Sequence, residues 1–175
     1  LSLGATFAWT FADHQLWSSF DGTGNRSNPA FICSNTGTRL VRCSLENTSA
    51  NAAATALQLV GGTQTVAYCW CKSPATATTN GTIQVGTFAG QFVGCVSEGG
   101  GLAGYNGTTG GSQYIQSIAL SNTVSGFLAT TGQIKVFYCT VYDPTVDGVR
   151  WTGTPGVQCC VVGSLFSNCA GIAIN

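Results

Sequence analysis

Hydrophobic and polar residues alternate with a period of two along most of this 175-residue chain. Such alternation is typical of half-buried β-strands, particularly in segments rich in Val, Ile, Thr, Phe and Tyr and bounded by Gly, Asn, Asp or Pro. The pattern predicts strands over residues 5–11, 37–43, 63–71, 82–88, 91–97, 113–120, 133–142 and 157–162.

Turn dipeptides punctuate these predicted strands at short intervals. They are Asp21-Gly22, Gly61-Gly62, Asn80-Gly81, Asn106-Gly107 and Asp147-Gly148. Short strands with frequent turn signals are typical of sandwiches and barrels. The sequence therefore predicts a mostly β, disulfide-stabilised antiparallel β-sandwich or barrel-like domain with at most one or two short helices.

Three segments depart from simple alternation. The Ala-rich residues 49–59 precede Gly61-Gly62 and predict a short helix with a glycine C-cap, and residues 164–169 predict a second short turn. Residues 99–111 carry seven glycines and predict a long exposed loop. Residues 65–69 (TVAYC) and 135–139 (KVFYC) resemble each other, which indicates either two related β-units or coincidence.

Cysteine is frequent and predicts disulfide bonds in an oxidising compartment. The nine candidates are Cys33, Cys43, Cys69, Cys71, Cys95, Cys139, Cys159, Cys160 and Cys169. The odd number leaves at least one thiol free or bonded to another chain. A Cys33–Cys43 bond across a turn is the one pairing that the spacing favours. Zinc, and any other metal or cofactor, is not expected, because C-x-C and adjacent cysteines do not match zinc-knuckle spacing.

Charged residues are scarce, at 7% of the chain, and the formal net charge is zero. Nucleic acid is not an expected partner, because its binding needs a cationic face. No apolar stretch is long enough for a membrane span. The low charge content and the high cysteine content together predict a secreted protein that is extracellular or on the cell surface. The candidate glycosylation sites are Asn25, Asn47, Asn80 and Asn106.

Candidate catalytic groups are sparse. His14 is the single histidine, and adjacent residues such as Asp13 cannot orient it as a catalytic triad requires. Asp143 and Asp147 form the best carboxylate pair, but turn chemistry accounts for both. The sequence therefore predicts no catalytic residue and no enzyme.

The leading functional hypothesis comes from the apolar N-terminus. Residues 1–20 form a terminal strand segment with Phe7, Trp9, Phe11 and Trp17, which either pairs within its own domain or is donated to a neighbouring subunit. Residues 21–175 form a single β-rich domain. The expected protein is an extracellular structural or adhesive subunit that assembles with copies of itself into a pilus-like surface filament, coat or matrix.

Two alternatives remain open at this point. One is a secreted carbohydrate-binding or adhesin module that presents the aromatic rings of Tyr105 and Trp151 to a glycan. The other is a small secreted hydrolase or effector, which needs clustered carboxylates or a Ser–His pair in a cleft.

Overall fold

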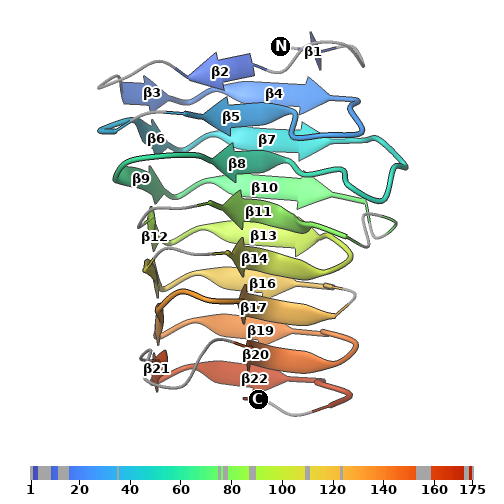
Figure 1. Ribbon diagram of the computed structural model, residues 1–175, viewed down its shortest axis with the longest axis vertical. Coiled ribbons are helices and arrows are strands. Elements are labelled where there is room, and N and C mark those ends of the chain that lie inside the picture. The colour runs from blue at the N-terminus through green and yellow to red at the C-terminus, as the bar shows by residue number, and fades with distance from the viewer. Residues whose placement is uncertain are drawn as a thin grey trace.

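The computed structural model of the chain describes residues 2–3, 9–11, 16–34, 36–74, 76, 79–86, 90–108, 111–122, 124–152, 159–171 and 174. All regular elements in these segments are β-strands, and every strand pairing among them is parallel. The chain winds into a β-solenoid in which three sheets, here named A, B and C, run along the rod (Figure 1).

Sheet A contains β1 (Ser2–Leu3), β4 (Asp21–Gly24), β7 (Ser44–Asn47), β10 (Trp70–Ser73), β13 (Val96–Gly99), β16 (Ile118–Leu120), β19 (Thr140–Tyr142) and β22 (Leu165–Ser167). Sheet B contains β2 (Trp9–Phe11), β5 (Phe31–Cys33), β8 (Leu57–Leu59), β11 (Gly81–Val85), β14 (Ala103–Gly107), β17 (Ser125–Ala129) and β20 (Asp147–Trp151). Sheet C contains β3 (Leu16–Ser18), β6 (Arg39–Val41), β9 (Gln64–Ala67), β12 (Gly90–Val93), β15 (Ser112–Ile115), β18 (Ile134–Phe137) and β21 (Cys159–Val162).

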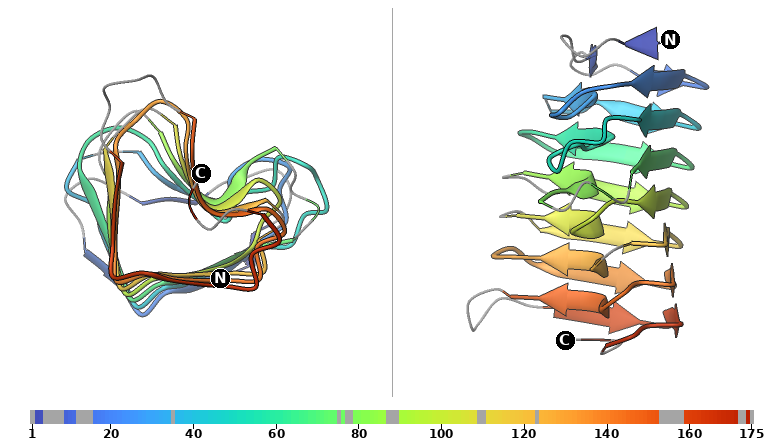
Figure 2. Two further views of the ribbon diagram at one scale, coloured as in Figure 1. Left: turned by 90° about the horizontal axis from the view of Figure 1, so that it is seen from below. Right: turned by 90° about the vertical axis from the view of Figure 1, so that its right-hand side faces the viewer.

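The chain visits sheets A, B and C in turn, so that β4 to β21 form six consecutive coils. Viewed along the rod, these coils lie over one another around an outline that is indented on one side (Figure 2). Ile83 pairs with Tyr105, 22 residues later, and with Leu57, 26 residues earlier. Each residue is therefore stacked on the residue that lies one coil away.

The prediction of an antiparallel sandwich or barrel was wrong, although the mostly β content is confirmed. Alternation with a period of two is the same in parallel and antiparallel strands, so it does not reveal the pairing. The long predicted strands each contain two short strands that meet at a corner. Residues 63–71, for example, contain β9 and β10, and Tyr68 between them has a φ of 54°. This left-handed residue redirects the chain from sheet C to sheet A.

Other local predictions also failed. The expected helix at residues 49–59 is a turn region followed by β8, and the expected turn at residues 164–169 contains β22. The expected glycine-rich loop at residues 99–111 contains β14, which is buried throughout. In β14, glycine permits close packing. Of the predicted strand at residues 5–11, only Trp9–Phe11 is described, as β2.

The resemblance between residues 65–69 and 135–139 reflects the repeat. Val66 stacks on Phe92, Phe92 on Tyr114, and Tyr114 on Val136. The two similar segments therefore occupy the same position three coils apart.

Two aromatic clusters fill much of the interior. The first contains Trp9, Phe11, Trp17, Phe20 and Phe31, and the ring centroids of Phe11 and Trp17 lie 5.2 Å apart in an edge-to-face arrangement. The second contains Phe92, Tyr105, Tyr114 and Phe127. Tyr105 stacks on Phe127 at 4.8 Å. Burial of such rings provides a large hydrophobic contribution to folding.

Glycines in sheet B allow it to approach sheet A. A Cβ atom on Gly126 would lie 2.5 Å from Cγ1 of Val141, and one on Gly104 would lie 3.1 Å from Cβ of Ala119. Because Gly104 and Gly126 occupy equivalent positions in consecutive coils, the close approach continues along the rod.

We expect Gly126→Ala to destabilise the fold by about 1–3 kcal/mol, because the added methyl group would overlap Val141 in a packed interior. Gly111→Ala is the matched control, because its Cβ would come no closer than 3.7 Å to Gln133. Urea denaturation of both variants measures the difference. Equal stabilities would contradict the close packing of sheets A and B.

Candidate functional site

The described residues include nine cysteine thiols. Four of these cysteines share one structural position. Cys43, Cys69, Cys95 and Cys139 each follow the left-handed corner residue between sheets C and A. Serine takes the same position in two other coils, as Ser117 and Ser164. We call this set the corner ladder: Cys43, Cys69, Cys95, Ser117, Cys139 and Ser164.

Hydrogen bonds explain why the corner ladder uses cysteine and serine. The Cys95 backbone N–H donates to Oγ of Ser117 at 3.3 Å, and the Ser117 N–H donates to Sγ of Cys139 at 3.4 Å. The same contact joins Cys43 to Cys69 at 3.3 Å. The N–H groups of Cys43, Cys95, Ser117 and Cys139 thus each find a side-chain acceptor in the next coil, as a buried donor requires.

The same side chains also act as donors within their own coil. Oγ of Ser117 donates to the Ile115 carbonyl at 3.1 Å, and Sγ of Cys139 donates to the Phe137 carbonyl at 3.3 Å. A residue that makes both bonds at this position must therefore be small and must both donate and accept at its γ atom. Serine and cysteine meet these requirements.

The predicted disulfides are not present, because all nine cysteines are free thiols. Cys33 lies in β5 of sheet B, whereas Cys43 lies at the corner between sheets C and A, so the two do not staple a hairpin. Burial raises the pKa of Cys33, and it raises that of Cys95 to about 11. These buried groups are neutral thiols that pack as small hydrophobic side chains.

Accessible thiols gather in the last coil. Cys159 is exposed and Cys160 and Cys169 are half-buried, whereas the six other cysteines are buried. The described residues contain no group of three or more His, Cys, Asp or Glu side chains arranged to hold a metal ion.

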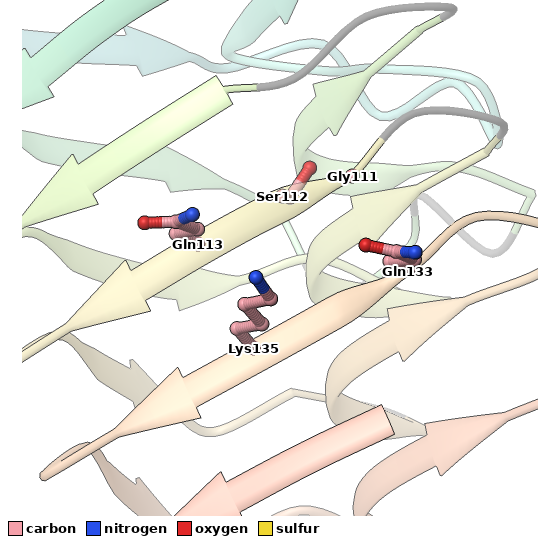
Figure 3. A pocket seen from close by; sticks show the side chains of 5 residues that line it. All are labelled: Gly111, Ser112, Gln113, Gln133 and Lys135. Atoms are coloured by element: carbon pink, nitrogen blue, oxygen red, sulfur yellow. The ribbon is translucent and has the colours of Figure 1, made fainter. Parts of the chain in front are cut away.

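A polar groove crosses the outer face of sheet C. One concavity is lined by Gly111, Ser112, Gln113, Gln133 and Lys135 (Figure 3). A second and larger one, with a volume of about 190 Å³, is lined by Thr63, Gly90, Gln91, Gly111 and Gln113. The two share Gly111 and Gln113, so together they form one shallow groove that spans four coils. We call it the sheet C groove.

Charged groups are divided between the faces of the rod. The outward column of sheet C that borders the groove contains Arg39 and Lys135, with Thr65, Gln91 and Gln113 stacked between them. The outer face of sheet A carries acids, including Glu98, whose carboxylate pairs with Nζ of Lys72 at 3.0 Å. Hydrogen bonding to Glu98 raises the pKa of Lys72.

The expected assembly strand lies inside its own solenoid. β2 pairs with β5 and β3 pairs with β6, and the side chains of Trp9, Phe11 and Trp17 pack in the first aromatic cluster. Phe7 lies outside the described residues.

The expected ligand-facing aromatics are not displayed on an open surface. Tyr105 is fully buried, and its hydroxyl donates to the Cys95 carbonyl at 2.9 Å. Trp151 is half-buried in β20. The exposed rings are instead Tyr68 and Tyr138 at the corners, together with Tyr142. In the sequence, Tyr68 and Tyr138 each stand immediately before a cysteine of the corner ladder, and this was the signal that could have indicated their exposure.

The four candidate glycosylation sites differ in exposure. Asn25 is exposed and Asn80 is half-buried, whereas Asn47 and Asn106 are buried. The Asn47 side-chain amide donates to the carbonyls of Asn28 and Thr55, which ties a loop to the rod. His14 and Asp13 lie outside the described residues. The pair of Asp143 and Asp147 is separated by burial, because Asp143 is exposed and Asp147 is buried near Arg150.

The architecture defines the chain as a parallel β-solenoid of about six coils. No family model, no curated protein and no solved structure matches it. A search of the described residues found no helix long and apolar enough to cross a membrane.

We expect Ser117→Ala to destabilise the fold by about 1–3 kcal/mol, because it leaves the buried Cys95 N–H without an acceptor. Ser117→Cys restores the arrangement found in neighbouring coils, so its stability should stay close to that of the wild type. Urea denaturation compares the two variants. If alanine and cysteine behave alike, the corner ladder does not contribute through hydrogen bonding.

A thiol reagent should modify the folded protein mainly at Cys159, which is exposed, and should reach all nine cysteines only after unfolding. Burial raises the pKa of Cys159 above the ordinary value of 9.0, so its alkylation should accelerate as the pH rises through that value. Mass spectrometry locates the label. A reductant should leave the melting temperature unchanged, and a fall would show that disulfides are present.

Proposed function

We propose that this chain is a structural rod that joins copies of itself end to end within an extracellular filament, coat or matrix. The observation that carries the proposal is the exposure of inward side chains in the last coil. These side chains are less buried than the equivalent side chains of the inner coils. The N- and C-termini lie at opposite ends of the rod (Figure 1).

Equivalent positions in successive coils illustrate this difference. Val136 in β18 is fully buried, whereas Val161, its partner in β21, is half-buried. Likewise Val141 in β19 is fully buried, whereas Phe166, its partner in β22, is half-buried. Solenoid repeats that end without a polar cap expose apolar surface that another repeat can cover.

Within the described residues, some backbone groups along the edge at this end also have no hydrogen-bond partner. The Leu165 N–H donates to the Cys139 carbonyl, and the Val162 carbonyl accepts from the Tyr138 N–H. Because neighbouring residues of a strand point their backbone groups to opposite sides, the N–H and C=O groups of Val161 and Phe166 face away from the rod. Such an edge is a template for a further strand.

The opposite end offers a suitable surface. β1, β2 and β3 are the first strands of their sheets. At this end of the rod, the ring of Phe20 packs against the rings of Trp9 and Trp17. A contact between two different ends is heterologous and does not close on itself, so repetition produces a filament. This route replaces strand donation, because the described strands of residues 1–20 already pair within the chain.

The extracellular location belongs to the proposal but no longer draws support from disulfides, since the cysteines are thiols. Carbohydrate binding through Tyr105 loses its basis because that ring is buried. A hydrolase would need clustered acids in a cleft, and Asp143 and Asp147 do not supply one.

Sedimentation velocity over a concentration series, followed by electron microscopy, tests the proposal. The wild type should associate into linear species. Val161→Pro should weaken association roughly tenfold, because proline removes an N–H that faces the free edge and blocks the approach of another strand.

Val161→Ala is the matched control, because it also shortens the side chain but keeps the N–H, so it should associate more strongly than the proline variant. Circular dichroism of both variants establishes that the rod is folded. A wild-type protein that stays monomeric at every concentration would overturn end-to-end assembly.

A further inference from the structure

The sheet C groove owes its depth to the absence of a side chain at Gly111. Among the described residues, a Cβ atom there would meet only ordinary contacts, at 3.7 Å from Cβ and 3.8 Å from Oε1 of Gln133. The backbone of Gly111 has no positive φ that would demand glycine. Neither crowding nor backbone strain therefore accounts for glycine at this position, and a larger residue would fill the groove.

The groups lining the groove suit a hydroxyl-rich ligand with negative charge. The amides of Gln91, Gln113 and Gln133 offer both donors and acceptors, and Lys135 offers an ammonium group. Neither concavity has a carboxylate among its described lining residues. Lys135 forms no ion pair with any described residue, so its charge is available to a ligand.

The arrangement of these groups also suits a ligand that is long and repetitive. Arg39, Thr65, Gln91, Gln113 and Lys135 stack in one outward column, each one coil from the next. Because neighbouring strands lie about 4.8 Å apart, the two cationic residues are about 19 Å apart along the rod. The column thus offers evenly spaced polar groups parallel to the rod axis, with a cation at each end.

A nucleic acid fits less well. Single-stranded nucleic acids are bound by aromatic stacking platforms in strongly cationic grooves. Among the described residues, the lining of this groove contains no aromatic residue and a single cation, Lys135.

We propose that the sheet C groove binds a linear anionic polysaccharide that lies along the rod axis. The ligand's carboxylate or sulfate group contacts Lys135, and its hydroxyl groups exchange hydrogen bonds with Gln91, Gln113 and Gln133. This site differs from the aromatic site expected from the sequence, and it does not depend on end-to-end assembly.

Isothermal titration calorimetry with three probes tests the proposal: polygalacturonate, dextran sulfate and neutral dextran. The wild type should bind at least one anionic probe and should bind dextran much more weakly. The comparison between the two anionic probes distinguishes carboxylate from sulfate recognition. Absence of binding to both anionic probes, or equal binding to dextran, would overturn the proposal.

Two variants locate the site. Gly111→Leu should abolish most of the binding by filling the groove, while its melting temperature stays near that of the wild type. Lys135→Gln should weaken binding roughly tenfold, since a hydrogen bond to a charged group is lost.

Lys72→Gln is the matched control, because it makes the same change of charge on sheet A, away from the groove. It should bind the anionic probe as the wild type does. Equal losses in Lys72→Gln and Lys135→Gln would show a non-specific response to total charge and would refute the site. The oligomeric state of each variant, measured in parallel, separates this result from the test of assembly.

Discussion

Parallel pairing in register is the constraint on which the rest of this structure depends. Each residue lies about 4.8 Å from its equivalent in the next coil, so every column must tolerate contact with itself. Apolar side chains satisfy this condition inside the rod. Like charges stacked directly over one another are destabilising, and where charges do stack on sheet A their signs alternate, from Glu46 through Lys72 to Glu98. The low charge content therefore has a cause in the fold that is independent of the compartment.

The cysteines illustrate how a column changes the meaning of composition. Counted along the sequence, nine cysteines suggest a disulfide framework. Stacked in the corner ladder, Cys69, Cys95 and Cys139 occupy a position that Ser117 also fills, where the γ atom both donates and accepts a hydrogen bond. A shared hydrogen-bonding role, and not oxidation, accounts for cysteine at the ladder positions.

The rod separates its sides from its ends. Along the sides, side chains in each column contact their equivalents in the coils above and below, and the sheet C groove arises where Gly111 interrupts a face of larger side chains. In the last coil, the described strands β21 and β22 pair with another strand on one side only. The inward side chains of Val161 and Phe166 are therefore partly exposed. The proposed ligand binding along a side and the proposed assembly at an end can therefore be changed independently by substitution.

The sequence by itself determined that the chain is built of strands with an alternation of period two, and inward residues such as Val66 and Val136 follow that alternation. It did not determine the partner of any strand, because the period of two is the same in either pairing direction and the coil length varies between 21 and 26 residues. The corner ladder, the burial of Tyr105 and the sheet C groove were decided by the tertiary structure alone. Each depends on residues from different coils, which winding brings to neighbouring positions along the rod.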